Sequence, residues 1–129
     1  MIRQTEVKKL KKISVGVDIE DISRFEKLNR VKNRTFLNKI FTERELNYCF
    51  SKARPASHLA ARFSGKEAIV KALSSRGMND INYNAIEILN DKQGIPQVNL
   101  LNDIKIKNIQ IEISLSHCQD KAVAFVILF

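Results

Sequence analysis

Four side chains in this sequence are the first candidates for binding a metal ion and phosphates. They are the carboxylates of Asp18 and Glu67, the ammonium of Lys71 and the imidazole of His117. Two carboxylates with room for water suit Mg²⁺, which proteins usually hold through one or two carboxylates together with substrate phosphates. Each of these residues could also have an ordinary structural role. The positions of the residues in helices and strands are needed to choose between a binding role and a structural one.

Glu67 and Lys71 belong to a segment, residues 59–73, whose apolar residues recur at helical spacing. Because the two residues are four positions apart, they share one flank of the predicted helix, where a surface ion pair contributes about 0.3–0.5 kcal/mol. This structural explanation suffices for the spacing alone, and a functional interpretation needs the second carboxylate that Asp18 supplies. The predicted buried stripe consists of Leu59, Phe63, Val70 and Leu73.

Two further residues of this helix are unusual for their positions. Lys66 falls inside the buried stripe, so its ammonium must either reach solvent along the aliphatic stem or meet an anionic partner. Gly65 is expected to cost up to about 1 kcal/mol relative to alanine unless close packing requires it.

Asp18 lies in a segment where aliphatic residues alternate with small or polar ones, which is the pattern of a half-buried strand. Asp18 is on the face opposite the aliphatic residues, which are Ile13, Val15, Val17 and Ile19. A helix capped by Asp21 and carrying Ile22, Phe25 and Leu28 is predicted to follow. Asp18 therefore stands near a strand end, where it can either meet Glu67 or cap the next helix.

The rest of the chain predicts one more helix and two hairpins. Thr42 and Glu45 have the spacing of a capping box, so a helix begins there and is stopped or redirected by Pro55. The helix that carries Glu67 is predicted to run from about residue 56 or 57 to 73 and to end at 76–77. Strands are predicted at 85–89, 95–101, 109–115 and 122–129, with the last hairpin completing the sheet. These elements indicate an α/β fold of the α+β type, with a small antiparallel sheet packed against helices.

His117 follows the third of these strands and is placed to face a cleft from the end of the sheet, although a lone histidine is more often a turn or core residue. Cys118 beside it suggests a nucleophile and base pair. Adjacent strand residues point to opposite faces, so thiol catalysis has little support.

Length, composition and net charge limit the kinds of protein that this chain can be. At 129 residues with 44% apolar residues, the chain is expected to form one domain over residues 13–129. It is preceded by a basic arm, residues 1–12, with Lys8, Lys9, Lys11 and Lys12. The net charge of +8 favours anionic ligands or partners. Two cysteines and the lack of a long apolar run predict a cytoplasmic protein without a disulfide framework, signal peptide or membrane span.

Four motifs in order resemble the holo-acyl-carrier-protein synthase family of phosphopantetheinyl transferases, across nearly the whole chain. They are Gly-Val-Asp-Ile-Glu-Asp-Ile-Ser-Arg at 16–24, Phe-Thr-Glu-Arg-Glu-Leu at 41–46, Ala-Arg-Phe-Ser-Gly-Lys-Glu-Ala-Ile-Val-Lys-Ala at 61–72 and Ser-Leu-Ser-His at 114–117. The resemblance implies transfer of the 4′-phosphopantetheine arm of coenzyme A to a serine of an apo acyl carrier protein. It also implies release of 3′,5′-ADP and a requirement for Mg²⁺.

The resemblance also implies roles for individual residues. Asp18 and Glu67 match metal-binding carboxylates with a catalytic role, and Lys71 matches a catalytic lysine near the pyrophosphate. His117, Arg54 and Arg62 match residues that contact coenzyme A, and Lys66, one position before Glu67, is grouped with them. Arg24 matches a residue that meets the acidic carrier protein. The general base is Asp18, Glu67 or a metal-held water, and we favour the water. The family further implies a homotrimer with active sites at subunit boundaries.

Two other functions compete with this interpretation. A basic nucleic-acid-binding module would use the amino-terminal lysines, but only 7% of residues are aromatic and tryptophan is absent, so no stacking platform is predicted. A non-catalytic coenzyme A binder is the second alternative, and the joint presence of Asp18, Glu67 and Lys71 argues against it. Neither nucleic acid nor membrane is expected as a partner.

Overall fold

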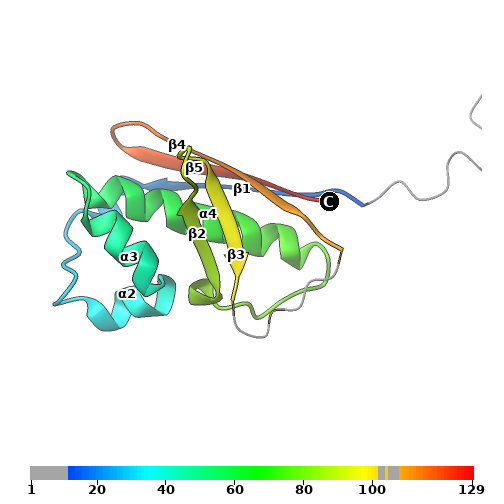
Figure 1. Ribbon diagram of the computed structural model, residues 1–129, viewed down its shortest axis with the longest axis horizontal. Helices are drawn as coiled ribbons and strands as arrows, with labels where there is room; N and C mark the ends of the chain where they lie inside the picture. Colours follow the sequence, from blue (N-terminus) through cyan, green and yellow to red (C-terminus); the bar gives the residue numbers. More distant parts are fainter. Residues whose placement is uncertain (1–11, 102–103, 105–107) are drawn as a thin grey trace, which may run out of the picture.

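A long helix, α4 (Pro55–Ser74), runs through the middle of the molecule and carries most of the residues discussed above (Figure 1). The computed structural model describes residues 12–101, 104 and 108–129. The predicted basic arm therefore lies outside the described residues, apart from Lys12. Pro55 occupies the first turn of α4, where its missing N–H costs no hydrogen bond, so the helix begins one residue earlier than predicted.

Three antiparallel strands cover one side of α4 in the order β1 (Ser14–Asp21), β5 (Lys121–Leu128) and β4 (Ile111–His117) (Figure 1). The hairpin of β2 (Ile86–Asn90) and β3 (Pro96–Leu100) forms a separate two-stranded sheet rather than part of the first one. The predicted α+β class is confirmed. Because β4 and β5 are antiparallel, the end of β4 lies beside the start of β5, and His117 is paired with Ala122.

The shorter helices partly differ from the prediction. The segment after β1 is only a 3-10 turn, η1 (Ile22–Phe25), and Asp21 makes no side-chain cap but pairs with Lys121. A helix that the sequence did not predict, α2 (Arg34–Ile40), follows in the basic stretch, because Leu37 and Ile40 bury one side of it. The predicted capping box is confirmed at the start of α3 (Glu43–Phe50), and η2 (Tyr83–Ala85) precedes β2.

The two faces of β1 are arranged in an unexpected way. The strand has Asp18 opposite the aliphatic residues as predicted, but the polar face is the one that packs on α4. Gly16 makes this contact possible, since a Cβ there would overlap the backbone carbonyl of Ala68. The aliphatic face points outward, with Val15 and Val17 58% and 57% exposed.

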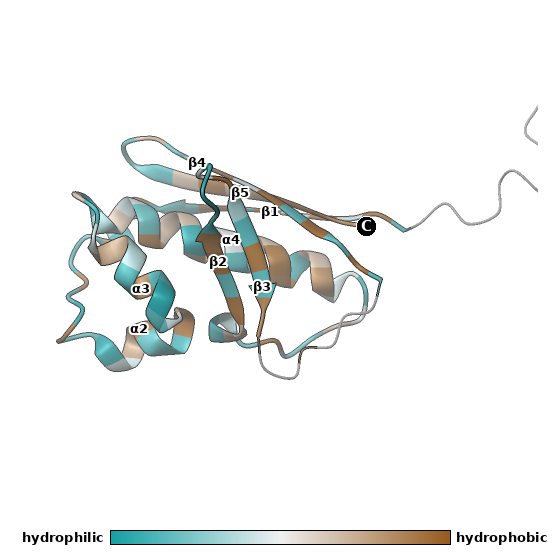
Figure 2. Ribbon diagram, viewed as in Figure 1, coloured by the Kyte–Doolittle hydropathy of each residue, from teal (hydrophilic) through white to brown (hydrophobic). Residues whose placement is uncertain are grey.

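Apolar residues pack on both sides of α4 and form two core clusters. One lies between α4, η1, α2 and α3, and the other between α4 and the strands β2, β4 and β5 (Figure 2). Polar residues of α4 are consequently buried along with the apolar ones, Arg62 and Lys66 among them. Among the described helices, none has the length and apolar run needed to cross a bilayer.

Candidate active site

Asp18 of β1 and Lys71 of α4 meet where the strand crosses the helix. The Nζ atom of Lys71 donates to Asp18 Oδ1 and to the Val17 carbonyl, both at 3.1 Å. The surface ion pair of Lys71 with Glu67, which spacing alone suggested, is therefore replaced by a pair with Asp18. The Asp18 side chain is 11% exposed, and its Oδ2 is buried without a hydrogen-bond partner in the described part of the chain.

Glu67 faces the same cluster from α4. Its Oε1 accepts a hydrogen bond from the hydroxyl of Tyr83 in η2. This hydrogen bond, together with burial and the charges of Glu67, Asp18 and Glu20, raises the pKa of Tyr83 to about 12. Sequence reasoning missed Tyr83, because nothing local links it to a residue 16 positions earlier.

Glu20 is a third carboxylate in the cluster. It lies two positions after Asp18 on the same face of β1, and its buried side chain pairs with Arg24 at 2.5 Å. Burial first, and then the neighbouring negative charge of Asp18, raise the pKa of Glu20 to about 7. The period-two spacing from Asp18 is a signal that could have identified Glu20 from the sequence.

The acid cluster fits a Mg²⁺ ion bound in part by protein. Among the described residues no group of three or more His, Cys, Asp or Glu side chains is arranged to enclose a metal. Mg²⁺ does not need such a cage, because it keeps several waters and takes one or two carboxylates plus substrate phosphates. The partnerless Oδ2 of Asp18 is a buried acceptor that a cation would satisfy. The charge of Asp18 adds to the effect of burial on the pKa of Glu20, and a cation would relieve that part of the shift.

A cavity of about 180 Å³, separate from the acid cluster, brings Arg62 and His117 together. Arg62 is buried, donates from Nε to the Ile88 carbonyl at 3.1 Å and stacks 4.2 Å above the Tyr48 ring. The imidazole of His58 lies between the rings of Tyr48 and His117, with centroids 5.7 and 6.0 Å away. The cavity thus concentrates cationic and aromatic groups, which suits a nucleotide with phosphate groups.

The sequence did not single out His58. Its pKa lies below the usual value, because burial disfavours the charged imidazole and the positive charges of Arg62, His117 and Lys52 add to the effect. Since α4 carries both His58 and Arg62 four positions apart, the two residues share one side of the helix. That spacing was the available signal.

Lys66 does not fit the coenzyme A contact that the sequence predicted. It is 0% exposed, and its ammonium donates to Glu45 Oε1 at 2.7 Å, to the Tyr83 carbonyl at 2.9 Å and to the Ile86 carbonyl. Burial lowers the pKa of Lys66, and the charge of Glu45 opposes that shift. Its three donors are all used inside the core, so we assign Lys66 a structural role. Glu45 is the anionic partner that a lysine in the buried stripe requires.

Arg54 and Arg24 lie outside the 180 Å³ cavity. Arg54 pairs with Glu26 at 2.5 Å and donates to the Gln119 carbonyl at 2.7 Å. Arg24 is 60% exposed and remains at the rim of the acid cluster through its pair with Glu20. The thiol of Cys118 donates to Asp120 at 3.2 Å, and no hydrogen bond joins it to His117 in the described residues.

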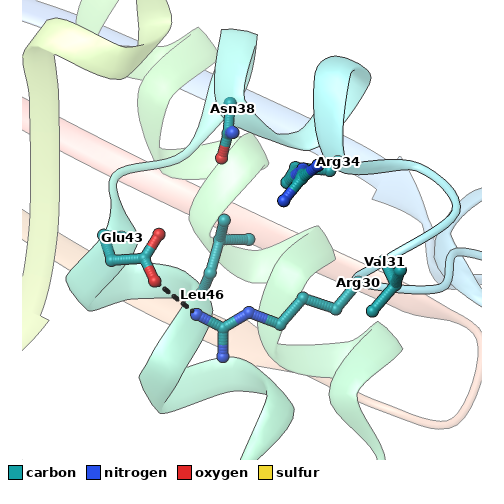
Figure 3. A pocket seen from close by; sticks show the side chains of 6 residues that line it. All are labelled: Arg30, Val31, Arg34, Asn38, Glu43 and Leu46. Carbon is teal, nitrogen blue, oxygen red and sulfur yellow. Dashed lines mark hydrogen bonds and ion pairs between the residues drawn. The ribbon is translucent and has the colours of Figure 1, made fainter.

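Another cavity, of about 260 Å³, lies between α2, α3 and the chain that precedes α2 (Figure 3). The guanidinium of Arg30 crosses its mouth and pairs with Glu43 at 2.9 Å, while Leu46 forms the apolar floor (Figure 3). None of the predicted site residues lines this cavity, although Glu43 and Leu46 belong to the motif at 41–46.

Comparison with known proteins places the chain in a family. Residues 14–126 match the model of the 4′-phosphopantetheinyl transferase superfamily. The holo-[acyl-carrier-protein] synthase of Chloroherpeton thalassium is 41% identical over 117 residues, which are 90% of this chain and 97% of that protein. The synthase of Thermodesulfovibrio yellowstonii is 44% identical over 114 residues, covering 88% and 96%.

A solved ACPS–CoA complex from Chronobacterium ammoniagenes has the same fold, with a TM-score of 0.76 and 29% sequence identity. The likeness covers 92% of this chain and 97% of that one.

Proposed function

The chain belongs to the 4′-phosphopantetheinyl transferase superfamily, and from this premise we propose how its residues perform that family's reaction. The protein transfers the 4′-phosphopantetheine group of coenzyme A to an apo acyl carrier protein. A serine oxygen of the carrier bonds to the β-phosphorus, the bond from that phosphorus to the bridging oxygen breaks, and 3′,5′-ADP leaves. The serine proton passes to a base. Residues 13–129 form the single domain that we assign to this activity.

We assign the metal site to Asp18 and Glu67. The observation that carries this assignment is the buried Oδ2 of Asp18, which lacks a partner while Oδ1 is held by Lys71. When bound there, Mg²⁺ would offset the charge of the coenzyme A diphosphate and align the attacking and leaving oxygens. Lys71 holds a positive charge beside this site, where it offsets charge that builds up on the leaving phosphate.

The nucleotide end of coenzyme A is proposed to occupy the cavity of Arg62 and His117. Arg62 is fixed by the Ile88 carbonyl and the Tyr48 ring, so it is already oriented before a phosphate arrives. Arg54 is exposed near the same end of α4 and remains a candidate contact for the 3′-phosphate. Cytoplasmic location is part of the same proposal, because both cysteines are free and coenzyme A chemistry suits a reducing compartment.

We further propose that the active site lies between subunits of a homotrimer. Glu67 follows Arg62 by five positions, about 140° around α4, so the acid cluster and the nucleotide cavity open on different sides of the helix. The outer face of β1 and β5 supplies an apolar surface for assembly. On this face, Val17 of β1 is paired with Phe125 of β5, and Val15 is paired with Ile127. No residue of the described chain covers this face.

The acidic carrier protein is proposed to dock at the rim near Arg24. This residue is 60% exposed beside the acid cluster, so a negative partner there would place its serine near the diphosphate. Charge complementarity of this kind mainly raises the rate of association.

Mass spectrometry of the carrier tests the proposal. Apo acyl carrier protein incubated with the enzyme, coenzyme A and Mg²⁺ should gain a phosphopantetheine adduct, which a chelator should prevent. Glu67→Gln should abolish transfer and leave the fold intact, because a proposed metal ligand is lost. Glu43→Gln, the same change in an exposed carboxylate of α3, should keep full activity. Salt-sensitive nucleic-acid binding without any adduct would favour the nucleic-acid-binding alternative, and coenzyme A binding without transfer would favour a non-catalytic binder.

A further inference from the structure

We propose that Tyr83 is a positioning residue for Glu67, and that the buried Lys66–Glu45 ion pair holds Tyr83 in place. The hydroxyl of Tyr83 fixes one carboxylate oxygen of Glu67 and leaves the other, Oε2, available as a ligand. The inference rests on the proposed role of Glu67 at the metal site. It adds a residue to that site which lies outside all four motifs of the sequence.

Three contacts fix Tyr83. Its hydroxyl donates to Glu67 Oε1, its ring packs against Phe63 with centroids 5.5 Å apart, and its backbone carbonyl accepts from Lys66 Nζ at 2.9 Å. Lys66 and Glu67 are consecutive residues of α4. The same turn of the helix therefore anchors the backbone of Tyr83 and receives its hydroxyl.

The ion pair behind Tyr83 is itself rigid. Glu45 Oε1 accepts from Lys66 at 2.7 Å and from the Thr42 backbone at 2.9 Å, while Oε2 accepts from the Ile88 backbone at 2.8 Å. Both partners are 0% exposed. These bonds tie α3, α4 and the start of β2 together around η2, so the position of the phenol is set by the core rather than by a free loop.

Such an arrangement matters because a glutamate side chain has several rotamers, of which only some present an oxygen to the metal site. A hydrogen bond from a fixed outer partner selects the rotamer before the ion binds. Removing outer-sphere partners of this kind typically weakens metal affinity by about 10–100-fold.

The test is the variant Tyr83→Phe, which keeps the ring on Phe63 and removes only the hydroxyl. Mn²⁺ is titrated into the full-length protein with saturating coenzyme A and no carrier protein, and free Mn²⁺ is followed by electron paramagnetic resonance. We expect the dissociation constant for Mn²⁺ to rise about tenfold, with an unchanged circular dichroism spectrum. Ser74→Ala removes an exposed hydroxyl of α4 that donates to Asn79, outside both proposed sites, and should leave the Mn²⁺ affinity unchanged.

Two further variants separate this inference from the proposed function. Glu67→Gln should weaken Mn²⁺ binding strongly, and adding Tyr83→Phe to it should cause no further loss. If Glu67→Gln weakens binding and Tyr83→Phe does not, the role of Tyr83 is wrong and the metal site stands. If neither variant changes the affinity, Glu67 is no ligand and both assignments fall. Equal losses in Tyr83→Phe and Ser74→Ala would indicate general loosening and would also overturn the inference.

Discussion

Lys66 and Glu67 are neighbours in the sequence, yet α4 sends their side chains into different surroundings. Lys66 is sealed in the core with Glu45, whereas Glu67 reaches the acid cluster beside β1. Successive helical residues are about 100° apart, so a buried helix can carry a structural residue and a functional one side by side. Family motifs that include both residues do not distinguish these roles.

Replacing Lys66 tests its structural assignment. Lys66→Met leaves the Glu45 carboxylate buried without its cation, so the free energy of unfolding should fall by about 3–5 kcal/mol. Urea denaturation at neutral pH measures this loss. Lys39→Met, at an exposed site of α2, should change stability by less than about 0.5 kcal/mol. A Lys66→Met protein of normal stability with a raised KM for coenzyme A would instead restore the binding role predicted from the sequence.

The imidazole of His58 should make stability depend on pH. Its pKa in the folded protein is lowered, chiefly by burial and then by Arg62 and His117, so the unfolded chain binds the proton more readily. Stability attributed to this group is therefore present above the unfolded pKa of 6.5 and is lost as the pH falls below it.

His58→Phe should accordingly reduce the loss of stability between pH 7.5 and pH 5.5. Urea midpoints of the variant and the native sequence at both pH values give the comparison. Parallel pH dependences in the two proteins would rule out this contribution of His58.

At the level of elements, the close approach of β1 to α4 brings Asp18 to Lys71. Gly16 and the backbone of Ala68 form the contact, and the side chain of Ser64 adds a hydrogen bond to the Asp18 carbonyl at 2.8 Å. Because β1 lies so close to α4, the carboxylates on the inner face of the strand lie beside the surface of the helix.

Gly16→Ala should force the two elements apart. The added methyl would meet backbone atoms that cannot rotate away, and we expect a loss of about 1–3 kcal/mol in unfolding free energy together with weaker transfer activity. Gly65→Ala is the comparison. Its Cβ would lie 2.6 Å from the terminal methyl of Ile88, which can rotate, and alanine favours the helix. Thermal unfolding should rank Gly16→Ala as the less stable variant, and the reverse order would contradict this account.

For the molecule as a whole, the outer face of β1 and β5 determines the proposed assembly. Ile13, Val17 and Phe125 are 66%, 57% and 45% exposed, an arrangement that a monomer would not favour. Because the two halves of the site open on different sides of α4, assembly and catalysis should be lost together.

Val17→Lys tests that coupling. A charge in the middle of the apolar face should convert the proposed trimer to monomer, as measured by light scattering coupled to gel filtration, and should reduce transfer activity in parallel. Val31→Lys makes the same change at a valine that is 79% exposed elsewhere and should leave the mass unchanged. A fully active monomer of Val17→Lys would show that one chain contains a complete site.

Local patterns in the sequence were enough to predict most elements. The Thr42–Glu45 capping box, the alternation around Asp18 and the helical spacing from Leu59 to Leu73 each depend on residues a few positions apart, and each of these elements is present in the structure. Of the predicted buried stripe, Leu59, Phe63 and Leu73 are buried and Val70 is only partly buried. The order of the motifs likewise sufficed to predict the family.

Only the tertiary structure decided which face of β1 is buried, which anion partners Lys66, and that Glu20 and Tyr83 join the acid cluster. The partner of Lys66 is 21 positions away and that of Glu67 is 16 positions away. Periodicity describes the sides of one element, whereas these contacts depend on how closely separate elements pack. The close approach of the β1 backbone to the α4 backbone at Gly16 cannot be predicted from the hydropathy pattern, although it determines where the carboxylates of β1 lie.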